Sequence, residues 1–135
     1  MLDSCTSTAV VAEIMRPKPK TILGMDTVRE ALRVMTYHQI RHLVVVSHCG
    51  SLCGLISQRD ILRSLAQNGD GLALIQDTMS KPVAHITPDM PVNEAARLMW
   101  DRRIGCLPIL NEGGELVGII TRSDVLRHFG TNQPD

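Results

Sequence analysis

Aromatic side chains are nearly absent from this 135-residue sequence, which contains one Trp, one Tyr and one Phe. Its hydrophobic core must therefore be aliphatic, and a hydrophobic content of 44% is enough for one compact domain. An excess of charge is also absent, because 14 basic residues balance 14 acidic residues. The sequence has neither the basic surplus typical of nucleic-acid binding nor a charged tail, so we predict no nucleic-acid partner.

Long apolar runs are missing as well. No run reaches the roughly 18 residues that a membrane-spanning helix needs. The N-terminal stretch MLDSCTSTAVVAEIM lacks the positive start and the apolar run of a signal peptide. We therefore predict a cytoplasmic protein with no membrane partner. In that compartment the four cysteines are expected to be thiols rather than disulfides.

Catalytic motifs are the third absence. The sequence has no Gly-x-Ser-x-Gly elbow, no P-loop and no His-Glu-x-x-His pair, so we predict that the protein is not an enzyme and requires no cofactor. A metal or thiol site remains an alternative, because five suitable residues lie close together: His38, His42, His48, Cys49 and Cys53. We favour a simpler interpretation, with Cys53 buried in a strand and Cys49 exposed in a turn.

An internal repeat is the main positive feature. When the sequence is shifted by 64 positions, residues 15–63 align with 79–127 without a gap, and 16 of these 49 positions are identical. Coincidence would give far fewer identities, so the chain contains one unit written twice. Two copies are too few for a solenoid, and we expect them to pack on each other.

Each copy is predicted to run strand, helix, strand, strand, helix. An extended lead segment, PKPKTIL or KPVAHIT, comes first because proline disfavours helix. Apolar residues at helical spacing predict the first helix, and Thr27 with Glu30 predicts a capping box at its start. Two strands and a second helix complete each copy, at HLVVV, LCGLIS and RDILRSLA, and at CLPIL, LVGIIT and RSDVLRHF. The apolar strands are expected to be buried on both faces or nearly so.

The predicted fold class is therefore α/β (α+β), with two β-α-β-β-α repeats. We predict an N-terminal segment with a short helix at residues 1–14 and a first repeat at residues 15–65. A linker at residues 66–71 joins it to the second repeat at residues 72–129, and residues 130–135 form a tail. Tyr37 and Trp100 lie near the ends of the two first helices. They predict either an interface between two chains or partly buried helix ends.

Several motifs in order resemble a tandem pair of cystathionine-beta-synthase (CBS) domains, known as a Bateman module. These are the "IM.P" start, then IRHLVVV or IGCLPIL, then a glycine, apolar residues and Ser/Thr-x-x-Asp, over residues 11–129. The resemblance implies that the repeats pack pseudo-symmetrically into one module and that modules pair into a disc-shaped homodimer. It also implies binding of AMP, ADP, ATP or S-adenosylmethionine and regulation of a partner protein.

The repeated stretches GLISQRD (54–60) and GIITRSD (118–124) allow two interpretations. Ser57 with Asp60, and Thr121 with Asp124, fit a capping box, with the hydroxyl at the N-cap and the acid at N3. The same geometry suits a nucleotide, because a helix N-terminus attracts phosphate and a carboxylate can accept from two ribose hydroxyls. The resemblance implies the second role for all four residues.

The resemblance further implies that each site uses the lead segment of the other copy. For the site at Thr121 and Asp124, the implied residues lie within 15–21 and include Lys20 and Thr21. For the site at Ser57 and Asp60, they lie within 79–85 and include Val83, Ala84 and His85. The methionines that begin these segments, Met15 and Met79, fit either core packing or base contact.

Basic residues near the motifs are candidate phosphate ligands: Arg41, His42, Arg59 and Arg122. IRHLVV resembles the basic-pair variant of the family in the regulatory gamma subunit of AMP-activated protein kinase. The alternative is that Arg41 and His42 are solvated surface groups. Converging cations would favour a nucleotide over S-adenosylmethionine.

We therefore predict a non-catalytic sensor whose regulatory ligand, an adenine nucleotide, binds between the repeats and alters an unknown regulated protein. One alternative is a structural dimerisation module with non-functional pockets. Others are a module responsive to S-adenosylmethionine, or to metal or thiol chemistry through Cys49, Cys53 and the nearby histidines.

Overall fold

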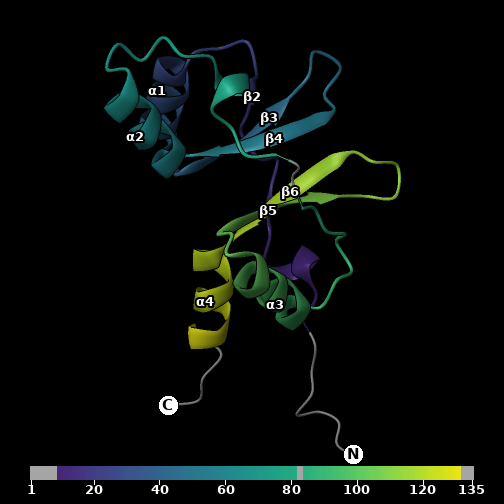
Figure 1. The fold of residues 1–135 in the computed structure, drawn as a ribbon. Helices are drawn as coiled ribbons and strands as arrows, with labels where there is room; N and C mark the ends of the chain where they lie inside the picture. Colours follow the sequence, from purple (N-terminus) through teal and green to yellow (C-terminus); the bar gives the residue numbers. More distant parts are fainter. Residues whose placement is uncertain (1–8, 82–83, 132–135) are drawn as a thin grey trace, which may run out of the picture. The chain divides into compact units, whose positions relative to one another are not determined.

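The computed structural model describes residues 9–81 and 84–131, which form two compact units of mixed α and β structure (Figure 1). One unit consists of residues 19–81. The other combines residues 9–18 with residues 84–131. The chain thus passes out of the unit that contains residues 9–18 after Lys18, and it belongs to that unit again from Ala84 onward. The predicted fold class, with four α-helices and two small sheets, is confirmed.

The unit of residues 19–81 holds the body of the first repeat. Its elements are β2 (Thr21–Leu23), α1 (Val28–His38), β3 (His42–Val46), β4 (Leu52–Ser57) and α2 (Gln58–Gln67). The sheet order is β2-β3-β4, with β2 parallel and β4 antiparallel to β3. This is the strand, helix, strand, strand, helix order that the sequence predicts. A 3₁₀ turn, Ile75–Asp77, follows.

The unit of residues 9–18 and 84–131 holds the body of the second repeat. Its elements are β1 (Arg16–Pro17), α3 (Val92–Arg102), β5 (Cys106–Leu110), β6 (Leu116–Thr121) and α4 (Arg122–Thr131). The sheet order is β1-β6-β5, and both neighbours run antiparallel to β6. The lead segment of the first repeat therefore adds a strand to the sheet of the second repeat.

The predicted first strand of the second repeat is reduced to one parallel bridge, between Ile86 and Ile109. The Ile86 N–H donates to the Pro108 carbonyl at 3.1 Å, and the Leu110 N–H donates to the Ile86 carbonyl at 2.9 Å. The next bond of a parallel ladder would need the N–H of Pro88, which proline lacks. The ladder therefore stops after one residue. The predicted N-terminal helix is also shorter than expected, because only Val11–Glu13 form a 3₁₀ turn among the described residues.

The capping box predicted at the first helix is half formed. Thr27 caps α1, since its hydroxyl oxygen accepts the Glu30 N–H at 3.2 Å. The Glu30 carboxylate binds Arg33 instead of the N-cap backbone, and this hydrogen bond lowers the pKa of Glu30. Both first helices end on a non-glycine residue in the left-handed conformation, at Gln39 (φ 57°) and Arg103 (φ 56°).

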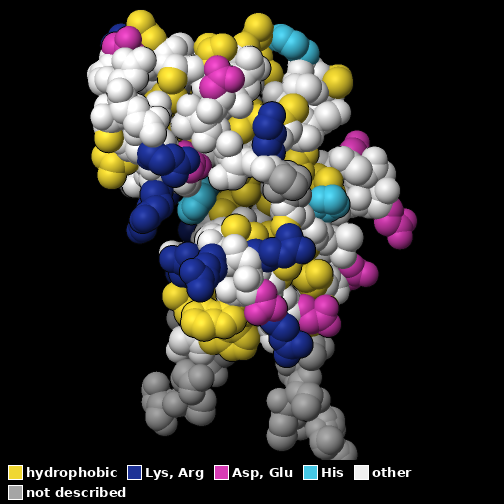
Figure 2. Space-filling view, viewed as in Figure 1, with side chains coloured by type: hydrophobic (Ala, Val, Ile, Leu, Met, Phe, Trp, Pro, Cys, Tyr) yellow, Lys and Arg dark blue, Asp and Glu magenta, His cyan; other side chains and the backbone are white. Residues whose placement is uncertain are grey.

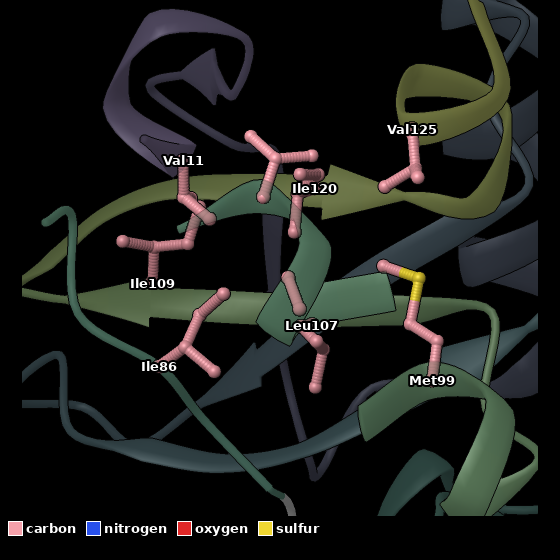
Figure 3. Close-up of a cluster of buried hydrophobic side chains, with 9 residues drawn as sticks. Val11, Ile86, Met99, Leu107, Ile109, Ile120 and Val125 are labelled. Carbon is pink, nitrogen blue, oxygen red and sulfur yellow. The ribbon is translucent and has the colours of Figure 1, made fainter. Parts of the chain in front are cut away.

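Each unit has its own aliphatic core beneath its two helices, as the lack of aromatic residues requires. Figure 3 shows one of them, in which β5, β6, α3 and α4 surround a cluster of fully or nearly fully buried side chains that includes Val11, Leu107, Ile109 and Ile120. The other core contains the equivalent side chains Met35, Leu43, Ile56 and Ile61. Burial of this kind stabilises by about 25 cal/mol per Å² of apolar area.

Burial of the strands departs from the prediction in one respect. The central residues of β3 and β5 are buried, as expected, but β4 has one exposed position. Cys53 lies at this position, so its predicted burial is wrong. Side chains alternate between the two faces of a strand, and Gly54 and Ile56 are the buried residues of β4. Cys49 is exposed in the turn, as predicted. No helix among the described residues is long and apolar enough to cross a membrane.

Candidate functional site

The two Ser/Thr-x-x-Asp motifs form the same hydrogen-bonded pair. At the start of α2, Oδ2 of Asp60 accepts the Ser57 N–H at 2.9 Å and the Ser57 hydroxyl at 3.0 Å. The Asp60 N–H in turn donates to Ser57 Oγ at 3.1 Å. At the start of α4, Thr121 and Asp124 make the same three bonds, at 2.9, 2.9 and 3.3 Å. The capping prediction is therefore confirmed at both motifs.

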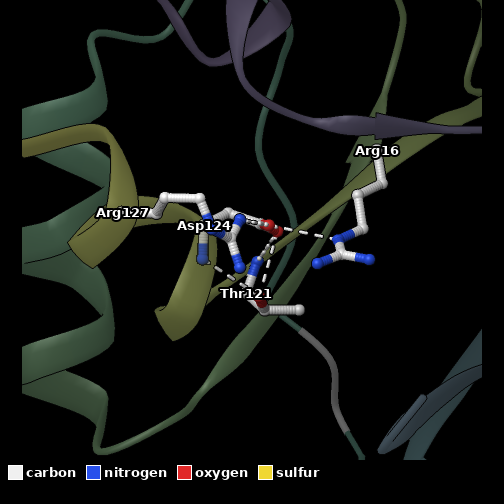
Figure 4. Close-up of polar contacts among 4 residues, drawn as sticks. All are labelled: Arg16, Thr121, Asp124 and Arg127. Carbon is white, nitrogen blue, oxygen red and sulfur yellow. Dashed lines mark hydrogen bonds and ion pairs between the residues drawn. The ribbon is translucent and has the colours of Figure 1, made fainter. Parts of the chain in front are cut away.

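The second oxygen of each carboxylate faces arginine. Oδ1 of Asp60 accepts a hydrogen bond from Arg63, one turn further along α2, at 3.0 Å. Oδ1 of Asp124 accepts the matching bond from Arg127 at 3.3 Å and another from Nε of Arg16 at 3.1 Å (Figure 4). Arg16 reaches Asp124 from β1, which pairs with β6.

The carboxylates are buried, whereas their arginine partners are not. Asp60 and Asp124 are 8% and 5% exposed, but the side chains of Arg16, Arg63 and Arg127 are each more than half exposed. An exposed cation in such a pair contributes at most about 1 kcal/mol, because water screens the charges and the side chain loses conformational freedom. The capped oxygen is therefore held firmly, and the other oxygen is held by exchangeable partners.

A methionine packs over a glycine in both sites. A Cβ atom on Gly118 would lie 2.5 Å from the sulfur of Met15, and one on Gly54 would lie 2.6 Å from the sulfur of Met79. The residue after each methionine pairs with the adjacent strand. Arg16 lies opposite Ile119, and Ser80 lies opposite Leu55. Packing against the strand therefore accounts for both methionines, and the glycines leave the space for them.

The basic candidates of the first repeat lie around Ser57. Strand pairing sets His42 opposite Ser57, and the carbonyl of the exposed Arg41 accepts the Gln58 N–H at 2.9 Å. Arg59 is exposed in the first turn of α2. The structure thus brings these three basic side chains to the same end of the sheet as Asp60.

In the second repeat the arginine lies on the other side of the corresponding backbone hydrogen bond, at the residue that donates it. Gly105 replaces Arg41, and Arg122 replaces Gln58. A Cβ atom on Gly105 would lie 3.2 Å from Nη2 of Arg122, so this guanidinium lies against the glycine. At this pair of positions each repeat therefore has one arginine. It is Arg41, just before β3, in the first repeat and Arg122, at the start of α4, in the second.

Four other predicted residues do not lie in the same unit as the motif that the resemblance implies they serve. Lys20 and Thr21 lie beside β3, where the Lys20 carbonyl accepts the Val44 N–H at 3.3 Å. Ala84 and His85 precede Ile86, and Ala84 packs against the core of the second repeat. Val83 lies outside the described residues. Contact of these residues with a shared ligand stays a prediction.

The thiols differ sharply in environment. Cys106 lies opposite Thr121 in the sheet, and burial, with a smaller effect of the Asp124 charge, raises its pKa to about 12. Hydrogen bonds from Ser47 and Ser51 lower the pKa of the exposed Cys49. No group of three or more potential metal ligands occurs among residues 9–81 and 84–131.

Two arginines that contact the carboxylates, Arg63 and Arg127, were not among the predicted site residues, and Arg16 was predicted only as part of the stretch 15–21 that the resemblance places beside Thr121 and Asp124. Arg63 and Arg127 are identical in the two copies and lie three residues after each Asp, a spacing that allows an ion pair on a helix. That signal was readable from the sequence. No local pattern singles out Arg16, which lies 108 positions from Asp124, although the resemblance implied that its segment faces that residue.

A family model described as CBS domain matches this chain twice, at residues 11–67 and 75–131. The chain is 34% identical over 119 residues to an uncharacterized protein of Methanopyrus kandleri, covering 87% of this chain and 61% of that protein. It is 33% identical over 127 residues to a homoserine O-acetyltransferase of Methanohalobium evestigatum, covering 94% of this chain and 25% of the enzyme. The chain thus spans about a quarter of that enzyme.

Solved structures show the same fold. The CBS domain pair of protein MJ0100, in complex with 5′-methylthioadenosine and S-adenosyl-L-methionine, has a TM-score of 0.88 at 31% identity and covers 94% of this chain and 100% of that chain. A putative acetoin utilization protein from Vibrio cholerae has a TM-score of 0.85 at 30% identity, over 93% of this chain and 95% of that chain. CBSX2 in complex with AMP has a TM-score of 0.76 at 24% identity, over 90% and 96%, which shows likeness of fold alone.

Proposed function

Because the chain belongs to the CBS domain family, we propose that it is a non-catalytic regulatory module that binds an adenine nucleotide through its Ser/Thr-x-x-Asp motifs and signals to a partner protein. One observation carries the proposal. Both motifs hold a buried carboxylate at the start of a helix, with one oxygen capped and the other facing only exposed arginines. A purely structural cap needs only the first of these oxygens.

The chemistry of such a site suits a nucleotide. The first turns of α2 and α4 present backbone N–H groups and the positive end of the helix dipole, which favour a phosphate. Basic side chains at the same place would add charge-assisted hydrogen bonds: Arg41, His42 and Arg59 in one repeat, and Arg122 in the other. The outer oxygens of Asp60 and Asp124, which accept hydrogen bonds from exposed arginines, would accept from ribose hydroxyls.

The relatives support the class of ligand and leave its identity to experiment. 5′-Methylthioadenosine, S-adenosyl-L-methionine and AMP all contain adenosine, and the first two accompany a CBS domain pair that is 31% identical to this chain. The shared adenosine group is what an Asp that binds ribose would recognise. The charge of the remaining group would then decide between AMP, ADP, ATP and S-adenosylmethionine.

Signalling requires that a partner distinguish two states of the module. A ligand can shift the balance between them only by its difference in affinity for the two. We propose that the functional assembly is a homodimer, because the helices expose large apolar side chains that a monomer would leave in water. Figure 2 shows such side chains over α4, and the most exposed are Tyr37 at 80%, Trp100 at 84%, Leu62 at 68% and Leu126 at 64%. The alternative of partly buried Tyr37 and Trp100 is therefore wrong.

Titration calorimetry of the full chain with AMP, ADP, ATP, S-adenosylmethionine and 5′-methylthioadenosine tests the proposal. We expect saturable binding of at least one of them, and we expect Asp60→Asn and Asp124→Asn each to remove one site. Sedimentation with and without ligand reports the dimer. Absence of heat and of thermal stabilisation with every ligand at millimolar concentration would leave only the dimerisation module.

The non-enzyme, cytoplasmic and partner assignments stay predictions. Metal analysis of the purified protein separates the metal-responsive alternative, since a stoichiometric metal would favour it over nucleotide sensing.

A further inference from the structure

The two carboxylates differ in how many donors they already satisfy. Asp60 accepts three hydrogen bonds from the described residues: two from Ser57 and one from Arg63. Asp124 accepts four, because Arg16 is added to the corresponding two from Thr121 and one from Arg127. An ionised carboxylate has about four lone-pair positions. One position therefore remains open at Asp60, and none at Asp124.

The difference comes from one side chain at matched backbone positions. Arg16 lies opposite Ile119, and Ser80, 64 positions later, lies opposite Leu55, 64 positions before Ile119. The backbone of Ser80 bonds to Leu55 in both directions, at 2.8 and 3.3 Å, so the backbone at Ser80 is fixed against β4. The serine side chain is too short to reach Asp60 as Arg16 reaches Asp124.

The nearest cation in sequence does not replace Arg16 in the first repeat. Lys81 follows Ser80, and neighbouring side chains of an extended segment point in opposite directions. Among the described residues, the ion pair at Asp60 comes from Arg63. The outer oxygen of Asp60 is therefore open to a ribose hydroxyl without displacement of any donor.

At Asp124 a ribose hydroxyl must displace a donor. Arg127 has an identical counterpart, Arg63, in the other repeat, so the added obstacle is Arg16. Its side chain is 52% exposed, and it holds Asp124 through Nε alone. In Figure 4 the bond to Asp124 starts from Nε, and neither terminal nitrogen of Arg16 is joined to the residues drawn. These nitrogens could bind an anionic group, because guanidinium pairs with phosphate or carboxylate in a bidentate manner.

The energetic consequence depends on the ligand's charge. A phosphorylated adenosine that takes the carboxylate of Asp124 offers Arg16 a new anionic partner in exchange. A neutral nucleoside that binds the same carboxylate has no anionic group for Arg16, so the loss of the bond between Arg16 and Asp124 weakens its binding. The site at Asp60 imposes no such condition.

We propose that Arg16 is a specificity-determining residue that makes the site at Asp124 disfavour neutral adenosine ligands relative to anionic ones, whereas the site at Asp60, with Ser80 in the same place, has no such donor to displace. This inference rests on the proposed nucleotide binding. It adds that the two sites of one chain have different ligand preferences, set by one residue outside the Ser/Thr-x-x-Asp motif.

The test is a side-chain exchange read separately at each site. Met15 packs on Gly118 and Met79 packs on Gly54, so ¹³C-methyl NMR of methionine reports each site, with Met15→Leu and Met79→Leu used for assignment. The probes are AMP and adenosine, titrated into wild type, Arg16→Ser and Ser80→Arg. Arg33→Ser is the matched control, because it removes one exposed arginine whose partner is Glu30 on α1.

Arg16→Ser should lower the preference for AMP over adenosine at the Met15 signal about tenfold, as for the loss of one charge-assisted contact, by strengthening adenosine and weakening AMP at that site. Ser80→Arg should raise the same preference at the Met79 signal, and Arg33→Ser should leave both ratios as in wild type.

Two failures are distinguishable. If neither ligand shifts either methionine signal, the proposed nucleotide binding is wrong and this inference is wrong with it. If both ligands bind but Arg16→Ser leaves the AMP-to-adenosine ratio at the Met15 signal unchanged, nucleotide binding stands and the role of Arg16 is wrong. An equal change of the ratio in Arg33→Ser would also overturn it, because net charge would then explain the effect.

Discussion

Asp60 and Asp124 stand at the same place in the two repeats and cap their helices with the same three hydrogen bonds. Their surroundings differ on the outer side, where Asp60 meets one arginine and Asp124 meets two. The parts that hold the helix start are thus the same, and the outer parts, which we propose to face a ligand, have diverged. The comparison separates residues required by folding from residues free to set specificity.

The arginines around the two sites follow the same rule. Arg41 in the first repeat corresponds to Gly105 in the second, and Gln58 corresponds to Arg122. The backbone bond between these positions is kept at 2.9 Å in both repeats, although the charge comes from opposite sides of it. Each repeat thus has one arginine at this pair of positions, on opposite sides of the bond, and the role of Arg41 as phosphate ligand or surface group stays a prediction.

The largest expected effect concerns the glycine that both sites share. Gly54→Ala and Gly118→Ala should each lower the free energy of unfolding by about 2 kcal/mol, because the new Cβ meets methionine sulfur and a backbone carbonyl. Urea unfolding measures this. Gly113→Ala is the control and should be nearly neutral, since its closest contact would be 3.5 Å. Stability unchanged in both glycine variants would show that the lead segments do not pack on the strands as described.

The next effect compares the carboxylates themselves. Asp60→Ala and Asp124→Ala should each cost about 1 kcal/mol, because the N-cap residue loses the two hydrogen bonds that the carboxylate accepts, while its hydroxyl still caps the helix. Asp124→Ala should cost about 0.5 kcal/mol more, because it also loses the half-exposed ion pair with Arg16. In a double-mutant cycle, Arg16→Ser should cost less stability in the Asp124→Ala background than in wild type. Equal costs in both backgrounds would mean that Arg16 and Asp124 do not interact in solution.

The last effect, which vanishes at neutral pH, distinguishes the sheet ends behind the two sites, where Cys106 in one repeat replaces His42 in the other. The folded state holds the Cys106 pKa at about 12, above its ordinary value of 9.0. The unfolded chain therefore loses this proton first, and stability should fall as pH rises through the window from about 9 to 12, by about 1 kcal/mol at pH 10. Below pH 9 the thiol has no effect on the pH dependence.

Cys106→Val tests this prediction, since the variant should lack that part of the decline in unfolding free energy between pH 8 and pH 10. If wild type and Cys106→Val decline in parallel, the thiol titrates normally and is not buried in solution.

Much of the fold could be read from particular residues. The repeat, the order of elements and the caps at Ser57 and Thr121 are local features, since each depends on residues within a few positions of one another. The errors were also local in origin. Pro88 ended a strand that its neighbours favoured, and Cys53 was placed inside because an apolar run does not tell which face of its strand is buried.

The sequence by itself determined that one unit occurs twice and that each copy starts its second helix with a hydroxyl and a carboxylate, because capping is settled within four residues. Only the tertiary structure decided which side chains face those carboxylates from outside. Strand β1 crosses to the sheet of the second repeat, and this pairing brings Arg16 to Asp124 across 108 positions of sequence. No local pattern encodes such a contact, because it depends on where a whole segment packs and not on its neighbours in the chain.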